Sequence, residues 1–198
     1  MAAIQLIKGA GVARFSQSKL GGEPALGSEV LIPLDRSGTA MNFLLQLNFG
    51  ELATEPRGIL LVYVARDIEK AQAKDRKSYR FIWEAAGAPD VVQPTVDAGS
   101  PLVLASDTAS SDGAECEIFP TTHPRMREAQ LICAFSSNGI SYSDARAKDD
   151  CYSHLVEQAP SYKLLFSLRT DTGTNFLSLI QQDDYTNRML EKAWLLRF

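Results

Sequence analysis

The sequence predicts an α+β fold built mainly from antiparallel sheets with a few short helices. Apolar and polar residues alternate with a period of two over residues 43–49, and a β-branched and aromatic run follows at residues 59–65. The connection between these two strands is too short for the crossover that parallel strands need. The two clearest helix signals come only after residue 140, so sheet dominates the first half of the chain.

The first strand is expected at residues 43–49, where one face is apolar and the other carries amides. The apolar face collects Met41, Phe43, Leu45, Leu47 and Phe49, and the amide face collects Asn42, Gln46 and Asn48. Residues 59–65 show no alternation, which is typical of a strand covered on both faces. We expect the two strands to pair antiparallel around a one-turn helix at residues 50–53.

A third strand is expected at residues 78–84, with Tyr79, Phe81 and Trp83 on one face. The charged stretch before it, residues 67–77, has too few apolar positions for a buried helical stripe. It is expected to form a short helix at most.

Residues 87–113 are dense in Pro, Gly, Ser and Asp, which indicates a long excursion with one or two short edge strands at residues 91–92 and 102–104. Further strands are expected at residues 115–119, 129–135 and 140–142, the last of them after the tight turn that Asn138-Gly139 predicts.

The clearest helix is expected at residues 143–158, and Pro160 ends it. Residues 162–169 and 176–180 are expected to form a hairpin, and residues 185–196 a last helix. No hydrophilic linker divides the chain, so we expect one domain over residues 1–198. Two intimately packed halves with a boundary near 85–125 remain the alternative.

Composition and charge exclude several classes of protein. The chain has 198 residues with 20 Lys+Arg against 24 Asp+Glu, a net charge of −4, which argues against nucleic-acid binding. No apolar run approaches the roughly 20 residues of a membrane helix, and the N-terminus does not have the pattern of a signal peptide. The three cysteines are sparsely spaced and do not suggest a disulfide framework. We therefore expect a cytoplasmic protein with no membrane or nucleic-acid partner.

Charge is distributed unevenly along the chain. From Glu84 to Pro124 there is no Lys or Arg, but there are seven acids: Glu84, Asp90, Asp97, Asp107, Asp112, Glu115 and Glu117. One interpretation is a solvated loop region whose charges face water. The other is a negative face that attracts a basic protein partner and raises its encounter rate. We take these acids as candidate partner-binding residues.

Residues that would carry catalysis or bind a metal are sparse. His123 and His154 are the only histidines, and Cys151 with His154 has no second pair at zinc spacing. No nucleophile elbow or nucleotide-binding glycine motif is present. We therefore expect no metal, no cofactor and no catalytic residues.

Two features near the N-terminus call for special local structure. Gly21 and Gly22 predict a tight turn with positive φ rather than a phosphate-binding loop. Gln46 lies in the expected strand between apolar residues. A buried side-chain amide must have hydrogen-bond partners. Those partners are expected to be neighbouring backbone groups, with ligand contact as the alternative.

Four linked segments of the first 85 residues resemble the YwqG-like family of uncharacterised bacterial proteins. They are Ser18-Lys19-Leu20-Gly21-Gly22-Glu23-Pro24-Ala25-Leu26, then Pro33, residues 43–52 and residues 56–63, with residues 79–84 suiting a strand found downstream. The second half departs from the pattern: Ser167 replaces a family Gln, and no Trp-Gly-Asp follows. The resemblance implies an α+β fold with antiparallel sheets, a hint of internal duplication and no established reaction. Some relatives sit beside polymorphic toxins and are taken for immunity proteins.

Two functions are consistent with these observations. The first is a non-catalytic interaction protein, most specifically a cytosolic immunity protein that binds and neutralises a basic toxin domain. The second is a small-molecule-binding protein or enzyme with a pocket between the sheets near Gln46, Gly21 and Gly22.

Overall fold

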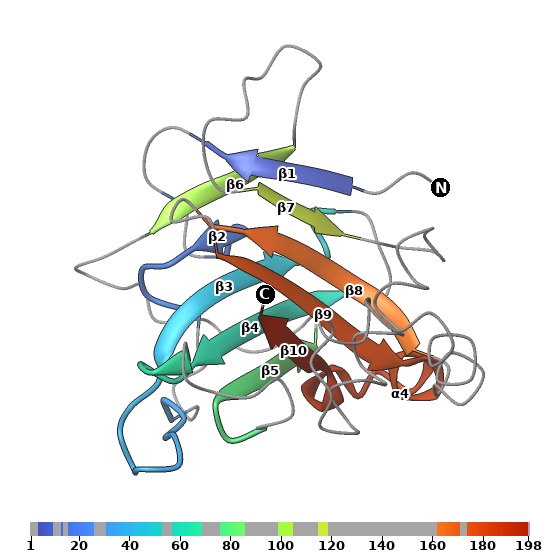
Figure 1. The fold of residues 1–198 in the computed structure, drawn as a ribbon. Coiled ribbons are helices and arrows are strands. Elements are labelled where there is room, and N and C mark those ends of the chain that lie inside the picture. The colour runs from blue at the N-terminus through green and yellow to red at the C-terminus, as the bar shows by residue number, and fades with distance from the viewer. Residues whose placement is uncertain are drawn as a thin grey trace, which may run out of the picture.

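The strands of the protein form two antiparallel sheets that share one strand, as expected for this α+β chain (Figure 1). The computed structural model describes residues 4–9, 13, 16–25, 31–52, 57–68, 76–85, 99–104, 115–118, 162–170 and 174–197. The strands are β1 (Ile4–Lys8), β2 (Lys19–Leu20), β3 (Asn42–Asn48), β4 (Gly58–Val64), β5 (Tyr79–Ala85), β6 (Ser100–Leu104), β7 (Glu115–Ile118), β8 (Tyr162–Arg169), β9 (Asn175–Gln181) and β10 (Trp194–Arg197). The named helices are α4 (Gln182–Thr186) and the 3-10 turn η2 (Leu190–Lys192).

The order of the strands is symmetric about the centre of the sheets. It runs β10-β9-β8-β7-β1-β6-β2-β3-β4-β5, so that a four-strand meander lies on each side of β1 and β6. The first strand of the chain, β1, pairs with β7 of the later meander, whereas β6 pairs with β2 of the earlier one. Each meander therefore receives a strand from the other part of the chain.

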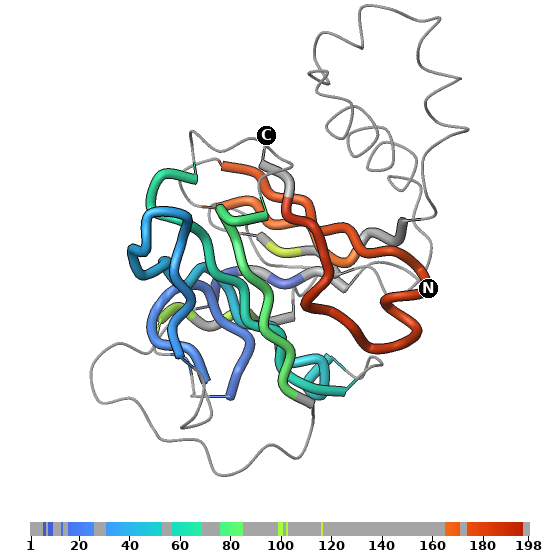
Figure 2. The backbone as a smooth tube through the Cα atoms, turned by 90° about the horizontal axis from the view of Figure 1, so that it is seen from below, coloured from blue at the N-terminus to red at the C-terminus, as the bar shows by residue number. Residues whose placement is uncertain are grey.

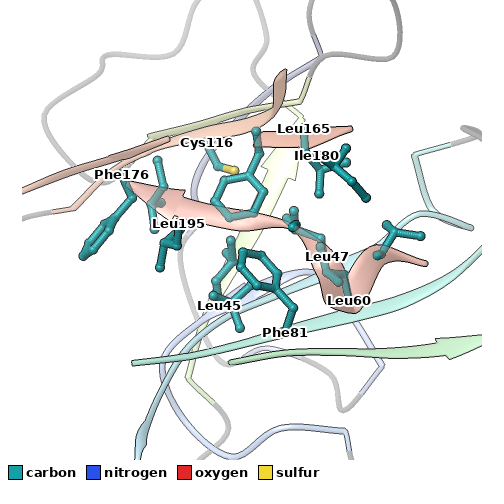
Figure 3. Packing of buried hydrophobic residues seen from close by; sticks show 14 of the residues in the cluster. Leu45, Leu47, Leu60, Phe81, Cys116, Leu165, Phe176, Ile180 and Leu195 are labelled. Carbon is teal, nitrogen blue, oxygen red and sulfur yellow. The ribbon is translucent and has the colours of Figure 1, made fainter. Parts of the chain in front are cut away.

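The main hydrophobic core lies between the two sheets, which face each other across it (Figures 2 and 3). Leu45, Leu47, Leu60 and Phe81 enter it from β3, β4 and β5. The opposite sheet contributes the buried residues Cys116, Leu165, Phe166, Phe176, Ile180 and Leu195. Because both meanders supply this one cluster, neither can bury its apolar face without the other.

The predicted pairing of the first two strands is confirmed, but the predicted face of β3 is wrong at its start. Phe43 pairs with Tyr63 and Leu45 pairs with the adjacent Val62, so Leu44 is the extra residue of a β-bulge. Met41 and Phe43 consequently belong to a second cluster on the outer face of this sheet, away from the main core. Leu45 and Leu47 are fully buried in the main core, as predicted.

The next two strands also follow the prediction. Residues of β4 are buried on both faces, since Leu60 and Val62 enter the main core and Leu61 and Tyr63 enter the outer cluster. On β5, Tyr79, Phe81 and Trp83 share the core face. The ring of Trp83 meets that of Phe49 edge-on, with centroids 5.7 Å apart.

Several expectations about local structure are wrong. Residues 50–52 form a turn instead of a helix, and β6 lies between β1 and β2 instead of at an edge. Residues 185–196 do not form one helix: α4 ends at Thr186, and β10 pairs with β9. Arg188 has φ 60°, which breaks the helical path, and β9 offers a backbone edge on which the Trp-Leu-Leu-Arg segment completes its hydrogen bonds.

The hairpin of β8 and β9 and the strand β7 are confirmed. The strands expected at residues 91–92, 129–135 and 140–142 and the helix at residues 143–158 lie outside the described residues, as does most of residues 67–77. No helix in the described part of the chain has the length and hydropathy of a membrane span.

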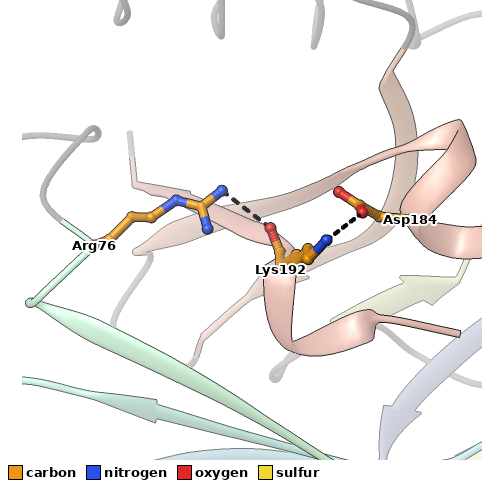
Figure 4. Close-up of polar contacts among 3 residues, drawn as sticks. All are labelled: Arg76, Asp184 and Lys192. Atoms are coloured by element: carbon orange, nitrogen blue, oxygen red, sulfur yellow. Dashed lines mark hydrogen bonds and ion pairs between the residues drawn. The ribbon is translucent and has the colours of Figure 1, made fainter.

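A polar junction connects the two outermost strands of the order. The guanidinium of Arg76, just before β5, stacks 4.0 Å from the ring centroid of Trp194 in β10. Its Nη2 also donates to the backbone oxygen of Lys192 at 3.0 Å, and Lys192 Nζ lies 2.9 Å from Asp184 Oδ1 (Figure 4). The C-terminal segment is thus held against the start of β5.

Candidate protein-binding site

Gln46 is fully buried in β3, and its amide binds backbone on both sides. Its Oε1 accepts a hydrogen bond from Ala25 N at 2.8 Å, and its Nε2 donates to Gln17 O at 2.8 Å. These contacts confirm the expectation that its partners are backbone groups. The Gln46 side chain therefore hydrogen-bonds both ends of residues 17–25 and holds them against the middle of β3.

The glycines between those two contacts make the turn that was predicted. Gly21 has φ 63° and Gly22 has φ 77°, in the region that favours glycine. Gly21 N donates to Leu44 O at 3.0 Å. A Cβ on Gly99, just before β6, would collide with the Gly21 backbone, so Gly99 is required for the close approach of this turn.

A second set of hydrogen bonds holds the same segment to the end of β3. Ser18 N donates to Glu51 Oε2 at 3.0 Å, and Ser18 Oγ accepts from Asn48 N at 2.9 Å. The Asn48 amide donates to Ser16 O and accepts from Gly50 N, both at 2.9 Å. The polar residues of this region therefore position the chain itself.

The acidic candidates are not gathered on one strand. Glu84 lies in β5, at one end of the strand order, whereas Glu115 and Glu117 lie in β7, beyond the central strands β1 and β6. Asp90, Asp97, Asp107 and Asp112 lie outside the described residues. The structure therefore places three of the seven and does not bring Glu84 beside the pair in β7.

The outer face of β3, β4 and β5 connects Glu84 to a small apolar cluster. Phe43, Ile59 and Ile82 are partly exposed there and pack on buried Met41, Leu61 and Tyr63. Glu84 pairs with Ile59 across the strands, so it borders the cluster at one end. Burial, with a smaller contribution from the charge of Glu84, raises the pKa of Tyr63 above its usual range.

At the other end of this face, residues 31–41 form a hairpin that the sequence pattern did not predict. Leu34 bridges Ala40, and Asp35 N donates to Thr39 O at 2.8 Å. Three large apolar side chains on it are exposed: Leu31 at 87%, Ile32 at 54% and Leu34 at 57%. Such a loop has a signal in the sequence. The turn residues Asp-Arg-Ser-Gly at 35–38 directly follow the apolar run Leu-Ile-Pro-Leu at 31–34.

The Asp35 carboxylate keeps this hairpin in shape. Oδ1 accepts from Ser37 N, Ser37 Oγ and Thr39 N at 2.7–2.9 Å. The Ser37 hydroxyl, then the Thr39 amide, lower the pKa of Asp35, so the carboxylate is ionised at neutral pH. Met41 N donates to Pro33 O at 2.9 Å at the base of the hairpin, where the Met41 side chain is buried.

Residues considered for a metal or a nucleophile add no further site here. Cys116 is fully buried in the main core. His123, His154, Cys133 and Cys151 lie outside the described residues. Within the ranges that the structure describes, no three His, Cys, Asp or Glu side chains form a group able to hold a metal ion.

Comparison with protein-family models places most of the chain in a described family. A family model described as "Domain of unknown function (DUF1963)" matches residues 18–195. None of the curated proteins compared with the chain matches it. The matched range begins at Ser18, inside the hydrogen-bond network of Gln46 and Asn48, and includes the exposed hairpin.

Proposed function

Because the chain belongs to the DUF1963 family, whose description states no function, we propose a function from its own residues: a non-catalytic interaction protein that binds a basic protein partner. The more specific proposal is an immunity protein of the YwqG-like type, located in the cytoplasm, that neutralises a cognate toxin domain. The resemblance of this chain to YwqG-like proteins supports the more specific proposal, because some of those proteins are encoded beside toxins.

The observation that carries the proposal is the one-sided charge of residues 84–124, which hold seven acids and no Lys or Arg. A concentration of one sign of charge accelerates the encounter with a protein of the opposite sign. Glu84, the first of these acids, is partly exposed on β5 at the edge of an apolar cluster. Toxin domains that act on nucleic acid are commonly basic, so an acidic inhibitor suits them.

The hydrogen bonds around Gln46 support a structural role for these polar residues. Both amide atoms of Gln46 bind backbone, and Ser18, Asn48 and Glu51 bind one another or neighbouring backbone. A pocket near Gln46, Gly21 and Gly22 that recognises a small molecule would need these groups for its ligand. The small-molecule alternative is therefore less well supported.

The test is to purify the chain together with the domain encoded by the adjacent gene. The proposal predicts a 1:1 complex by light scattering and, on co-expression in the host, protection from the toxicity of that domain. If the two proteins do not associate and the chain gives no protection, the proposal is wrong.

A further inference from the structure

We propose that one end of the sheet formed by β3, β4 and β5 is a contact site for an anionic lipid surface. This inference goes beyond the proposed function and does not depend on it. Leu31, Ile32 and Leu34 lie on the first arm of the hairpin of residues 31–41 and are exposed at 87%, 54% and 57%. Large apolar side chains exposed together mark interaction sites more often than scattered ones.

The hairpin shares its end of the sheet with two other segments. Because β3, β4 and β5 are antiparallel, the start of β3, the end of β4 and the start of β5 lie side by side. Ala65 N donates to Ser78 O at 2.7 Å across this end. In Figure 1 the hairpin, drawn in blue, extends beyond the strands. We call residues 31–42, 64–68 and 76–80 the hairpin end.

The hairpin end has an excess of cations, although the whole chain has a net charge of −4. Its cations are all exposed and outnumber its acids: the cations are Arg36, Arg66, Arg76, Lys77 and Arg80, and the acids are Asp35 and Asp67. Residues 69–75, between two of the segments, hold two lysines and two acids and leave this balance unchanged. Glu84 is four residues beyond Arg80 along β5, a distance of about 13 Å. The excess of positive charge therefore lies around the apolar arm.

Hydrogen bonds within the hairpin end do not cancel this charge. Arg76 and Arg80 donate to backbone oxygens, which are neutral acceptors. The Asp35 carboxylate accepts three hydrogen bonds from Ser37 and Thr39, so its charge is directed into its own turn. A surface that combines apolar side chains with cations gains from both burial and charge at an anionic lipid layer.

The shape of the apolar arm favours lipid over an acidic protein. Ile32 precedes Pro33, which favours an extended backbone there. Consecutive side chains of an extended segment point to opposite sides, yet Leu31 and Ile32 are both exposed. A fluid lipid layer can surround both sides of such an arm, whereas the surface of a folded protein contacts one. Nucleic acid also matches the charge, but its bases stack on aromatic rings rather than on leucine and isoleucine.

The depth of the contact follows from where the polar residues lie. The apolar side chains are on residues 31–34, whereas the turn at residues 35–39 is polar. An interfacial element enters about 5–10 Å into the boundary between headgroups and acyl chains. That depth accommodates the arm while the turn remains among the headgroups. A peripheral contact of this kind needs no spanning helix, and it differs from the expectation that the chain has no membrane partner.

Co-sedimentation with vesicles tests the apolar part of the site. The vesicles contain phosphatidylcholine alone or with about one third phosphatidylglycerol, at low salt. We expect the parent to sediment only with the anionic vesicles, and the double variant Leu31→Ser and Leu34→Ser to bind them about tenfold more weakly. Met189→Ser is the matched control, because Met189 is also exposed but lies between α4 and η2. It should bind as the parent does.

A second pair of variants tests the cations. Arg36→Gln with Arg66→Gln should weaken binding to the anionic vesicles about tenfold at low salt, and the difference should shrink as salt rises. The control, Arg57→Gln with Arg188→Gln, makes the same change in net charge at two exposed positions away from the hairpin end. It should bind within about twofold of the parent. Circular dichroism melts check that all variants fold.

The outcomes do not involve the domain encoded by the adjacent gene, so they leave the proposed function standing. If the parent stays in the supernatant with anionic vesicles at low salt, the lipid contact is wrong. If it sediments and the hairpin-end variants bind as tightly as their controls, lipid binds elsewhere and the assigned surface is wrong. If the parent is instead a dimer that Leu31→Ser and Leu34→Ser convert to a monomer, the assigned occupant is wrong.

Discussion

Ala25 N donates a 2.8 Å hydrogen bond to the buried Oε1 of Gln46, joining residues 21 positions apart in the chain. The opposite end of the same amide reaches Gln17 O at 2.8 Å. Between these contacts the chain makes the strand β2 and the turn at Gly21 and Gly22. One side chain thus hydrogen-bonds two backbone groups that lie on either side of it.

Replacing Gln46 by Leu keeps most of the volume but removes both of these hydrogen bonds. We expect a loss of about 2–4 kcal/mol in the free energy of unfolding, because each buried group left without a partner costs about 1–3 kcal/mol. Urea denaturation measures the loss. Gln182→Leu, at an exposed position of α4, should change stability by less than about 0.5 kcal/mol. Equal effects in the two variants would show that the network does not stabilise the fold.

Leu47→Ala tests the main core. Leu47 is fully buried between the sheets, and truncation of a buried leucine costs about 2–5 kcal/mol through lost apolar contact and the cavity that remains. Leu31→Ala, at the exposed hairpin, should cost almost nothing in folding. Chemical denaturation of both variants measures the difference, and a cost below about 1 kcal/mol at Leu47 would contradict the packing described here.

Alternation predicted the strands well, but it could not reveal the bulge at Leu44. The bulge depends on the partner strand, where Phe43 and Leu45 face the consecutive residues Tyr63 and Val62. A sequence pattern of period two assumes that no residue is inserted, so it placed Phe43 on the wrong face. The same limit applies to β1, which pairs with β6 and β7 from much later in the chain.

The C-terminal error has a different cause. Residues 185–196 have apolar positions that suit a helix, but the edge of β9 provides hydrogen-bond partners for Trp194–Arg197. Tertiary pairing therefore overrides local preference.

For the site, the roles of Gln46 and of the two glycines could be predicted from burial and turn chemistry. The exposure of Leu31 could not, since apolar residues in sequence are expected to be inside.

Tyr63→Phe is expected to change the alkaline stability of the protein. Tyr63 Oη is buried and finds no hydrogen-bond partner among the described residues, so its removal at pH 7 should cost less than about 1 kcal/mol. Burial raises the pKa of Tyr63 in the folded protein, whereas the unfolded chain releases this proton near pH 10. The folded state therefore binds more protons than the unfolded state above pH 10, and stability falls as pH rises, by up to about 1.4 kcal/mol per pH unit.

Urea denaturation between pH 8 and pH 11 compares parent and variant. The parent should lose stability more steeply than Tyr63→Phe above pH 10, and the two should run parallel below pH 9. Parallel curves over the whole range would show that this phenol titrates normally in the folded protein.

The contact of Arg76 with Trp194 is expected to couple the start of β5 to β10. A double-mutant cycle with Arg76→Ala and Trp194→Leu should give a coupling energy of about 0.5–1 kcal/mol, typical of a partly exposed cation–π pair. Denaturation of the four proteins measures it. A coupling energy near zero would mean that the stacked geometry contributes nothing to holding the C-terminal segment.

We propose that the acid-only stretch, residues 84–124, steers a basic partner to the protein. The most direct test is the association rate, by surface plasmon resonance at low and at physiological ionic strength, of the variant with Asp90, Asp107 and Asp112 changed to Lys. The matched control changes Asp67, Asp183 and Glu191 to Lys, three exposed acids outside the stretch with the same change in net charge. We expect only the first variant to associate markedly more slowly, mostly at low salt where screening is weak. An equal association rate for both variants would contradict steering by this stretch and show that its acids only face solvent.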